Sequence, residues 1–158
     1  MNSKYLTTVH AMIEQDLATS RQLLALLERE TDSTEARDYK AMSELLKEKT
    51  PLLDGLKKNA QMRSKLLLSS NQAANEKNWS LLLDSFNNDS VKQTWQEVKT
   101  TIEHCKSINN VNGKLINRGI QSHNKLLHLM RGNTLQADIY DAKGTKRSNN
   151  YSGMLTQA

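Results

Sequence analysis

A repeat of mostly apolar residues, at alternating spacings of four and three, runs without a break from Val91 to Met130, and this repeat constrains the fold most. Such spacing keeps one stripe of an α-helix facing a neighbouring helix, as in coiled coils. The positions that flank the stripe are polar in its first half and apolar in its second half. We therefore expect a long helix with a narrow seam at its start and a wide apolar binding surface at its end. The stripe consists of Val91, Trp95, Val98, Ile102, Cys105, Asn109, Asn112, Ile116, Gly119, His123, Leu126 and Met130.

The composition favours helix throughout the chain. Among 158 residues there are 6 Gly and 1 Pro, and no alternating run of β-branched residues occurs. Few helix breakers over so long a stretch argue against a sheet. We predict an all-α protein: an elongated antiparallel helical hairpin plus a long third major helix, packed as a coiled-coil-like bundle. The expected domains are a helical bundle over residues 1–130 and a flexible C-terminal tail over 131–158, where polar residues and glycine prevail.

The hairpin is expected from two further apolar repeats. The first helix should cover Ser3–Glu30, and a turn with a capping-box pattern should follow, in which Asp32 caps the next helix. The second helix carries its own repeat from Tyr39 to Leu67. So short a connection makes the two helices antiparallel neighbours.

The same repeats predict a register for the hairpin. Ile13 should face Leu53, and an ion pair should join Lys49 to Asp16 inside the seam. Pro51 lacks a backbone N–H, so we expect a kink rather than a restart of the second helix there.

Shorter elements separate the hairpin from the long helix. Residues 69–78 are small and polar and should form a loop, and a short helix is expected over Trp79–Phe86. The polar stretch Asn87–Ser90 then supplies caps for the long helix.

No pattern in the sequence indicates catalysis, a cofactor or a metal site. His123 and His128 are five positions apart, which does not place them on one helical face as metal ligands. The single cysteine, Cys105, lies on the apolar stripe and is expected to be a buried thiol. The chain is therefore not predicted to be an enzyme.

Charge and hydropathy limit the kinds of partner that this chain is expected to bind. The net charge is +5, but the basic residues are interleaved with acidic ones, so nucleic acid is not an expected partner. No apolar run approaches the roughly 20 residues of a membrane span. The N-terminus shows no secretory signal, so a cytoplasmic protein without membrane insertion is expected.

Polar positions in the second half of the stripe allow two interpretations. Buried Asn109 and Asn112 would fix partner and register. Alternatively, these residues and Gly119 would loosen the helix so that it can accept a guest helix, since glycine costs ~1 kcal/mol in a helix interior.

Several segments, taken in order, resemble the FlgN family of flagellar type III export chaperones. They are Leu23–Glu30, Leu45–Leu53, Arg63–Leu67, Asn109–Ile116 and Tyr140–Gly144. The resemblance covers nearly the whole chain. It implies a cytoplasmic chaperone that binds the C-terminal helices of hook-filament junction proteins (the FlgK and FlgL class) before export.

The resemblance also implies roles for particular residues. An apolar groove on the long helix would shield an amphipathic client helix. Family members use the C-terminal region to dock at an export gate component, and Tyr140 and Tyr151 are the candidates for that contact. The candidate client-binding residues are Leu115, Ile116, Ile120, Leu126, Leu127 and Met130.

Two other functions remain open at this point. A generic coiled-coil scaffold would use the wide apolar face to close a homodimer. A basic helical protein that binds nucleic acid would show steep salt dependence of binding, because phosphate contacts release counterions.

Overall fold

A computed structural model describes residues 3–130, and all the regular structure within this range is helical. The helices are α1 (Ser3–Glu35), α2 (Tyr39–Ser69), α3 (Glu76–Ser85) and α4 (Asp89–Met130). The all-α prediction is confirmed. The predicted tail, 131–158, lies outside the described residues. The chain divides into a first unit, residues 1–117, and a second unit from residue 118 on, and each is considered by itself.

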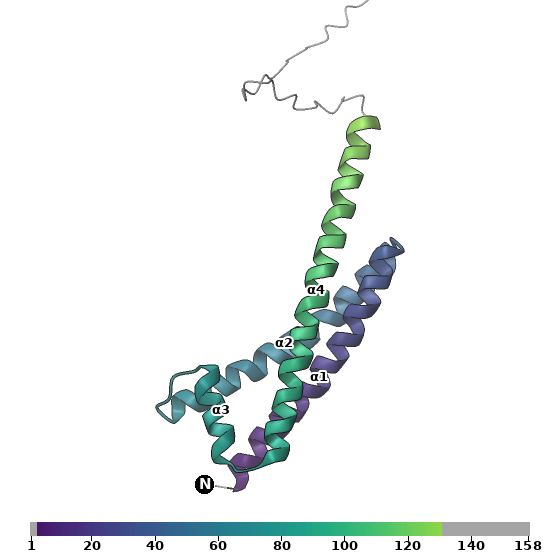
Figure 1. Cartoon of the computed structure of the whole chain (residues 1–158). Coiled ribbons are helices and arrows are strands. Elements are labelled where there is room, and N and C mark those ends of the chain that lie inside the picture. Colours follow the sequence, from purple (N-terminus) through teal and green to yellow (C-terminus); the bar gives the residue numbers. More distant parts are fainter. Residues whose placement is uncertain (1–2, 131–158) are drawn as a thin grey trace, which may run out of the picture. The chain divides into compact units, whose positions relative to one another are not determined.

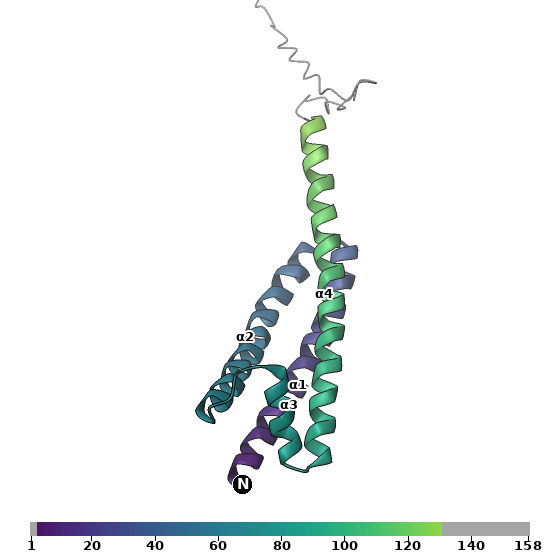
Figure 2. The ribbon, with the colours of Figure 1, turned by 60° about the vertical axis from the view of Figure 1, so that its left-hand side comes forward.

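In the first unit, α1 is the central helix (Figures 1 and 2). It forms an antiparallel hairpin with α2, as predicted. The first part of α4 runs parallel to α1, because Cys105 Sγ donates to the Ser20 carbonyl at 3.5 Å and Asn112 Nδ2 donates to the Leu27 carbonyl at 3.0 Å. Thus α1 contacts both α2 and α4.

The predicted turn at residues 32–35 is wrong, because α1 continues through Glu35. The Asp32 carbonyl accepts a helical hydrogen bond from the Ala36 N–H at 2.9 Å. The chain reverses at Arg37, which has a φ of 55°. Asp38 then caps α2, its side chain accepting from a backbone N–H at 3.0 Å. An N-cap residue must directly precede the first turn of its helix. Because the chain reverses at Arg37, Asp38 and not Asp32 occupies that position before α2.

The predicted Lys49–Asp16 ion pair is also wrong. Asp16 pairs instead with Arg63 and accepts from Asn59 Nδ2 at 2.8 Å, whereas Lys49 Nζ lies 3.0 Å from Glu30 Oε1. Each residue of α1 therefore faces a residue of α2 further along the chain than predicted. The Asp16 side chain is 1% exposed, and a carboxylate so buried requires close donors.

The predicted Ile13–Leu53 contact does not form either. Leu53 is 46% exposed, whereas Ile13 is fully buried. Helix α2 continues through Pro51, so the chain does not restart there. The kink itself stays a prediction.

Side-chain caps set the starts of the last two helices. Asn75 accepts from the Asn78 N–H at 2.8 Å, so α3 begins three residues before the predicted Trp79. Asn88, within the predicted capping stretch, accepts from the Val91 N–H at 3.3 Å. The loop before α3 is correspondingly shorter than predicted.

Two apolar clusters form the core of the first unit. One gathers residues of all four helices around the start of α4; the other joins α1 to the middle of α4. The first contains Val9, Ile13, Leu67, Trp79, Leu82, Leu83, Val91 and Val98, and the second contains Leu23, Leu27 and Cys105.

A polar cluster lies beyond the second apolar cluster. Asn112 is 1% exposed, donates to Glu30 Oε2 at 2.8 Å and accepts from Thr31 Oγ1 at 2.6 Å. Lys49 Nζ donates to both Glu30 and Asn109, the latter at 2.9 Å. These residues (Glu30, Thr31, Lys49, Asn109 and Asn112) form what we call the Asn112 cluster. Asn112 is thus buried, as the register-fixing interpretation expects, whereas Asn109 is exposed, contrary to that interpretation.

Replacing Asn112 should destabilise the fold. In Asn112→Ala the donors to Glu30 and to the Leu27 carbonyl are lost inside the protein, so we expect a loss of about 1–3 kcal/mol in the free energy of unfolding. Urea denaturation followed by circular dichroism measures it. Asn110→Ala, an exposed position on the same helix, is the matched control and should change stability by less than about 0.5 kcal/mol. Equal effects of the two substitutions would contradict the assignment.

Candidate functional site

The predicted client-binding residues are distributed over both units. Leu115 and Ile116 belong to the first unit and are half-buried. In the second unit, Ile120 is 54% exposed, Leu126 57% and Met130 77%. The sixth residue, Leu127, is half-buried. Tyr140 and Tyr151 lie outside the described residues.

Within the second unit, Ile120, Leu127 and Met130 share one helical face, whereas the exposed Leu126 and Leu129 lie further round the helix. Ile120 and Leu127 are two turns apart, and Met130 follows Leu127 by nearly one turn. Only basic charges accompany them in this stretch, from Arg118 and Lys125. The second unit thus presents an apolar face with a basic flank.

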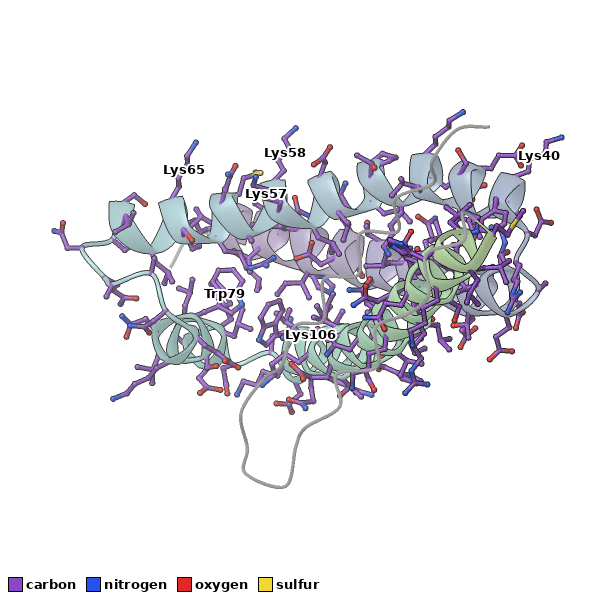
Figure 3. All side chains as sticks on the ribbon, turned by 90° about the horizontal axis from the view of Figure 1, so that it is seen from above. Lys40, Lys57, Lys58, Lys65, Trp79 and Lys106 are labelled. Carbon is purple, nitrogen blue, oxygen red and sulfur yellow. The ribbon has the colours of Figure 1, made fainter. Side chains whose placement is uncertain are left out.

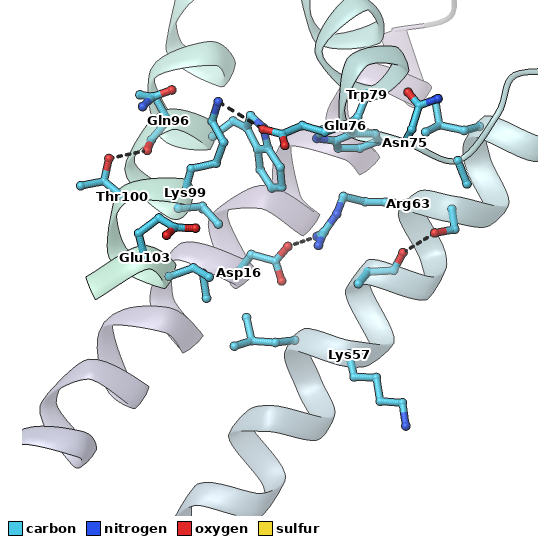
Figure 4. A pocket seen from close by; sticks show the side chains of 18 of the residues that line it. Asp16, Lys57, Arg63, Asn75, Glu76, Trp79, Gln96, Lys99, Thr100 and Glu103 are labelled. Atoms are coloured by element: carbon cyan, nitrogen blue, oxygen red, sulfur yellow. Dashed lines mark hydrogen bonds and ion pairs between the residues drawn. The ribbon is translucent and has the colours of Figure 1, made fainter. Parts of the chain in front are cut away.

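A second surface, which the sequence analysis did not identify, is a groove of about 830 Å³ in the first unit. Figure 4 shows it between α2 on one side and α3 and α4 on the other, with α1 at its base. Its apolar walls include Leu56 and Leu67 of α2, Trp79 of α3, and Val98 and Ile102 of α4. We call it the tryptophan groove.

An aromatic and ionic cluster occupies one end of the tryptophan groove. The guanidinium carbon of Arg63 lies 5.0 Å from the ring centroid of Trp95 and 5.9 Å from that of Trp79. The two indole rings are 5.8 Å apart and meet edge to face at 70°. Buried Asp16, bonded to Arg63 and Asn59, holds the guanidinium in place. Both cation–π contacts and the ion pair therefore fix Arg63.

The two indole N–H groups of this cluster have no acceptor among residues 3–130, although both nitrogens are buried. Trp79 is only 3% exposed. A buried N–H without an acceptor costs about 1–3 kcal/mol, so these two groups lower the stability of the fold.

Four basic side chains line the groove together with three acidic ones, Asp16, Glu76 and Glu103. Lys57 has no ion-pair partner in the part of the chain that the structure describes; Figure 3 shows it on α2, and in Figure 4 its side chain points away from Arg63 and Trp79. Lys99 lies 3.7 Å from a Glu76 oxygen. Lys106 lies 2.9 Å from its own helix neighbour Glu103. These two pairs are solvent-exposed, and such pairs contribute little to stability.

One feature of the sequence could have indicated this groove. Arg63 occupies a position on the apolar repeat of α2, and Asp16 occupies a buried position on α1. Charged residues on apolar faces mark either a buried ion pair or a site. Their pairing depends on the hairpin register, and the register predicted from the sequence is wrong.

Other chemistry is absent from the described range. Residues 3–130 contain no group of three or more His, Cys, Asp or Glu side chains that could hold a metal ion. Cys105 is buried as predicted, and burial raises the pKa of its thiol. Among the same residues no helix is long and apolar enough to cross a membrane.

These features define an all-α protein built from a helical hairpin and a long third helix, with two surfaces suited to protein contacts. The chain matches the family model described as FlgN protein over residues 1–148 and belongs to the FlgN family of flagellar export chaperones. The resemblance seen in the sequence is thereby confirmed. The family is one of chaperones that act in flagellar export, not a family known for catalysis. No match was found among curated proteins or among solved structures.

Removing Arg63 should destabilise the protein far more than removing an exposed arginine. Arg63→Met leaves the Asp16 carboxylate buried without its cation, so we expect a loss of about 3–5 kcal/mol. Arg21→Met breaks the exposed Arg21–Glu97 pair, whose atoms are 2.9 Å apart. That control should cost less than about 1 kcal/mol. Chemical denaturation of both variants measures the difference, and similar losses would show that Asp16 does not depend on Arg63.

Proposed function

We propose that this protein is a cytoplasmic chaperone that binds the C-terminal helical segments of hook-filament junction proteins, the FlgK and FlgL class, before flagellar type III export. Its membership of the FlgN family supports a role with flagellar export substrates in general. The choice of client and the residues that bind it are the further steps of the proposal.

The observation that carries the proposal is the change in exposure along α4. Near its start, Val91 is fully buried and Val98 is 4% exposed. In the second unit, Ile120, Leu126 and Met130 are all more than half exposed. Large apolar side chains that are exposed along one stretch of a helix mark an interaction site.

An amphipathic client helix fits such a face. Its own apolar side chains, three and four residues apart, would cover those of α4 in helix-to-helix packing. The proposed contact residues are those predicted from the sequence: Leu115, Ile116, Ile120, Leu126, Leu127 and Met130. Shielding would keep the client helix from associating with other copies before export.

The export gate contact is assigned to the C-terminal region. We place it at Tyr140, which lies in the segment resembling the family pattern, and at Tyr151. Single Tyr140→Ala and Tyr151→Ala variants should retain client binding and lose binding to the gate component in a pull-down.

Charge insertion into the apolar face should abolish client capture. For Leu126→Asp/Leu127→Asp we expect at least about a hundredfold weaker binding, because burying two unpaired carboxylates against apolar surface is strongly unfavourable. Binding is measured by pull-down and size-exclusion chromatography with C-terminal fragments of the two junction proteins. Leu46→Asp/Leu53→Asp, on exposed leucines of α2, is the matched control and should bind normally.

Other outcomes of the same experiment would contradict the proposal. A stable homodimer with no client complex would favour the scaffold. Binding to nucleic acid with steep salt dependence would favour the basic-protein alternative, since apolar docking depends only weakly on salt. Unfolding of the Leu126/Leu127 variant, seen as lost helicity, would identify these residues as core rather than contact residues.

A further inference from the structure

The large apolar side chains of residues 118–130 lie in one half of the circumference of α4. Successive residues of an α-helix are turned by about 100°, so Leu129 lies on the side of the helix opposite Ile120. The other three lie in the arc between these two: Leu126, Leu127 and Met130. Four of the five are more than half exposed, and Leu127 is half-buried. An exposed apolar arc therefore covers about half of the helix.

This arc is wider than the stripe that one partner helix covers. A helix that packs against a single neighbour buries an apolar stripe on the order of 100° wide. A client helix that docked over Ile120 and Leu127 would leave Leu129, on the far edge of the arc, in water. The surface of a lipid bilayer is flat, and its apolar layer can cover the whole arc at once.

The opposite half of this stretch carries only basic and uncharged side chains. Arg118 and Lys125 are seven residues apart, which places them in one row along the helix. Both are exposed, and neither has an ion-pair partner among residues 3–130. From residue 104 to residue 137 the sequence contains no Asp or Glu. The basic residues in this range are Lys106, Lys114, Arg118, Lys125 and Arg131. The charge therefore favours an anionic partner.

The position of the two cations favours a charged surface over a charged helix. Arg118 and Lys125 lie about 160° round the helix from Ile120 and Leu127, so carboxylates of a helix docked there would not reach them. The potential of an anionic membrane extends over a Debye length of about 10 Å, comparable with the diameter of a helix. Cations on the polar half of the helix are therefore attracted by such a membrane without direct contact.

We propose that residues 118–130 of α4 bind the surface of a membrane that contains anionic lipids. A basic amphipathic helix lies along such a surface, with its apolar half among the acyl chains and its cations near the headgroups. It does not cross the bilayer. The inference goes beyond the proposed function, because the partner is lipid and not a client. Since Leu126, Leu127 and Met130 belong to both surfaces, client and membrane would exclude each other.

Flotation of the full chain with lipid vesicles tests the proposal. Vesicles of phosphatidylglycerol and phosphatidylcholine in equal parts supply anionic headgroups, and vesicles of phosphatidylcholine alone are the control. We expect the chain to float with the anionic vesicles and to bind the neutral ones at least about tenfold more weakly. Added salt should weaken binding to the anionic vesicles, because it screens the attraction.

Charge variants locate the binding on α4. Arg118→Glu/Lys125→Glu should weaken binding to anionic vesicles by about tenfold or more, because it reverses two charges near the lipid surface. Lys40→Glu/Lys47→Glu makes the same charge change on exposed residues of α2 and should leave vesicle binding nearly unchanged. Neither pair belongs to the proposed client surface, so both variants should still bind the client fragments.

An apolar variant tests the other half of the helix. Leu129 is 55% exposed and is not a proposed client residue. Leu129→Asp should weaken vesicle binding by about tenfold or more, because a carboxylate is unfavourable among acyl chains. Leu68→Asp, at a leucine of α2 that is 60% exposed, is the matched control and should bind vesicles normally. Circular dichroism checks that all four variants keep their helicity.

Three results would overturn the proposal. The first is no flotation with anionic vesicles, and the second is equal flotation with both kinds of vesicle. The third is an equal effect of a variant and its control, which would place the binding elsewhere on the chain. A dimer that Leu129→Asp dissociates, without flotation, would assign the apolar arc to a second copy of the chain. Client binding is measured separately, so failure of this proposal would leave the proposed function standing.

Discussion

Two buried carboxylates on α1 determine how the other helices pack. Asp16 requires Arg63 and Asn59, and Glu30 requires Lys49 and accepts from Asn112 as well. An isolated buried charge is more unfavourable than the loss of several apolar contacts, so registers that leave either carboxylate unpaired are excluded. The apolar repeats stabilise the packing of the helices, whereas the buried carboxylates determine the register in which the helices pack.

This division explains which features of the fold were predictable. Spacing alone identified the helices and the antiparallel hairpin, because periodicity is a local property. Register was missed because a leucine repeat packs nearly as well after a shift of one or two heptads. The predicted Ile13–Leu53 contact satisfied the repeat but left Asp16 away from Arg63. A search for the partner of each charge on an apolar face would have corrected the register.

The two candidate surfaces differ in the same way. The apolar face of the second unit is formed by residues of a single helix, a few positions apart in the sequence. Ile120, Leu127 and Met130 could therefore be identified from the sequence alone. The tryptophan groove joins side chains of α1, α2, α3 and α4. Trp79 and Trp95 contact Arg63 only in the observed register of the α1–α2 hairpin. No local sequence pattern predicts that contact.

The Asn112 cluster also divides α4 into two parts that differ in how strongly they resist unwinding. Beyond Asn112 the helix contains Gly113 and Gly119, and a Cβ added at either would meet no atom within 4 Å. Each glycine weakens a helix by about 1 kcal/mol relative to alanine. Fraying from the carboxyl end therefore meets little resistance until it reaches the bonds of Asn112 to α1. Backbone amide hydrogens after residue 112 should exchange with solvent well before those that precede it. A partner that binds this stretch would have to supply the free energy that holds it helical.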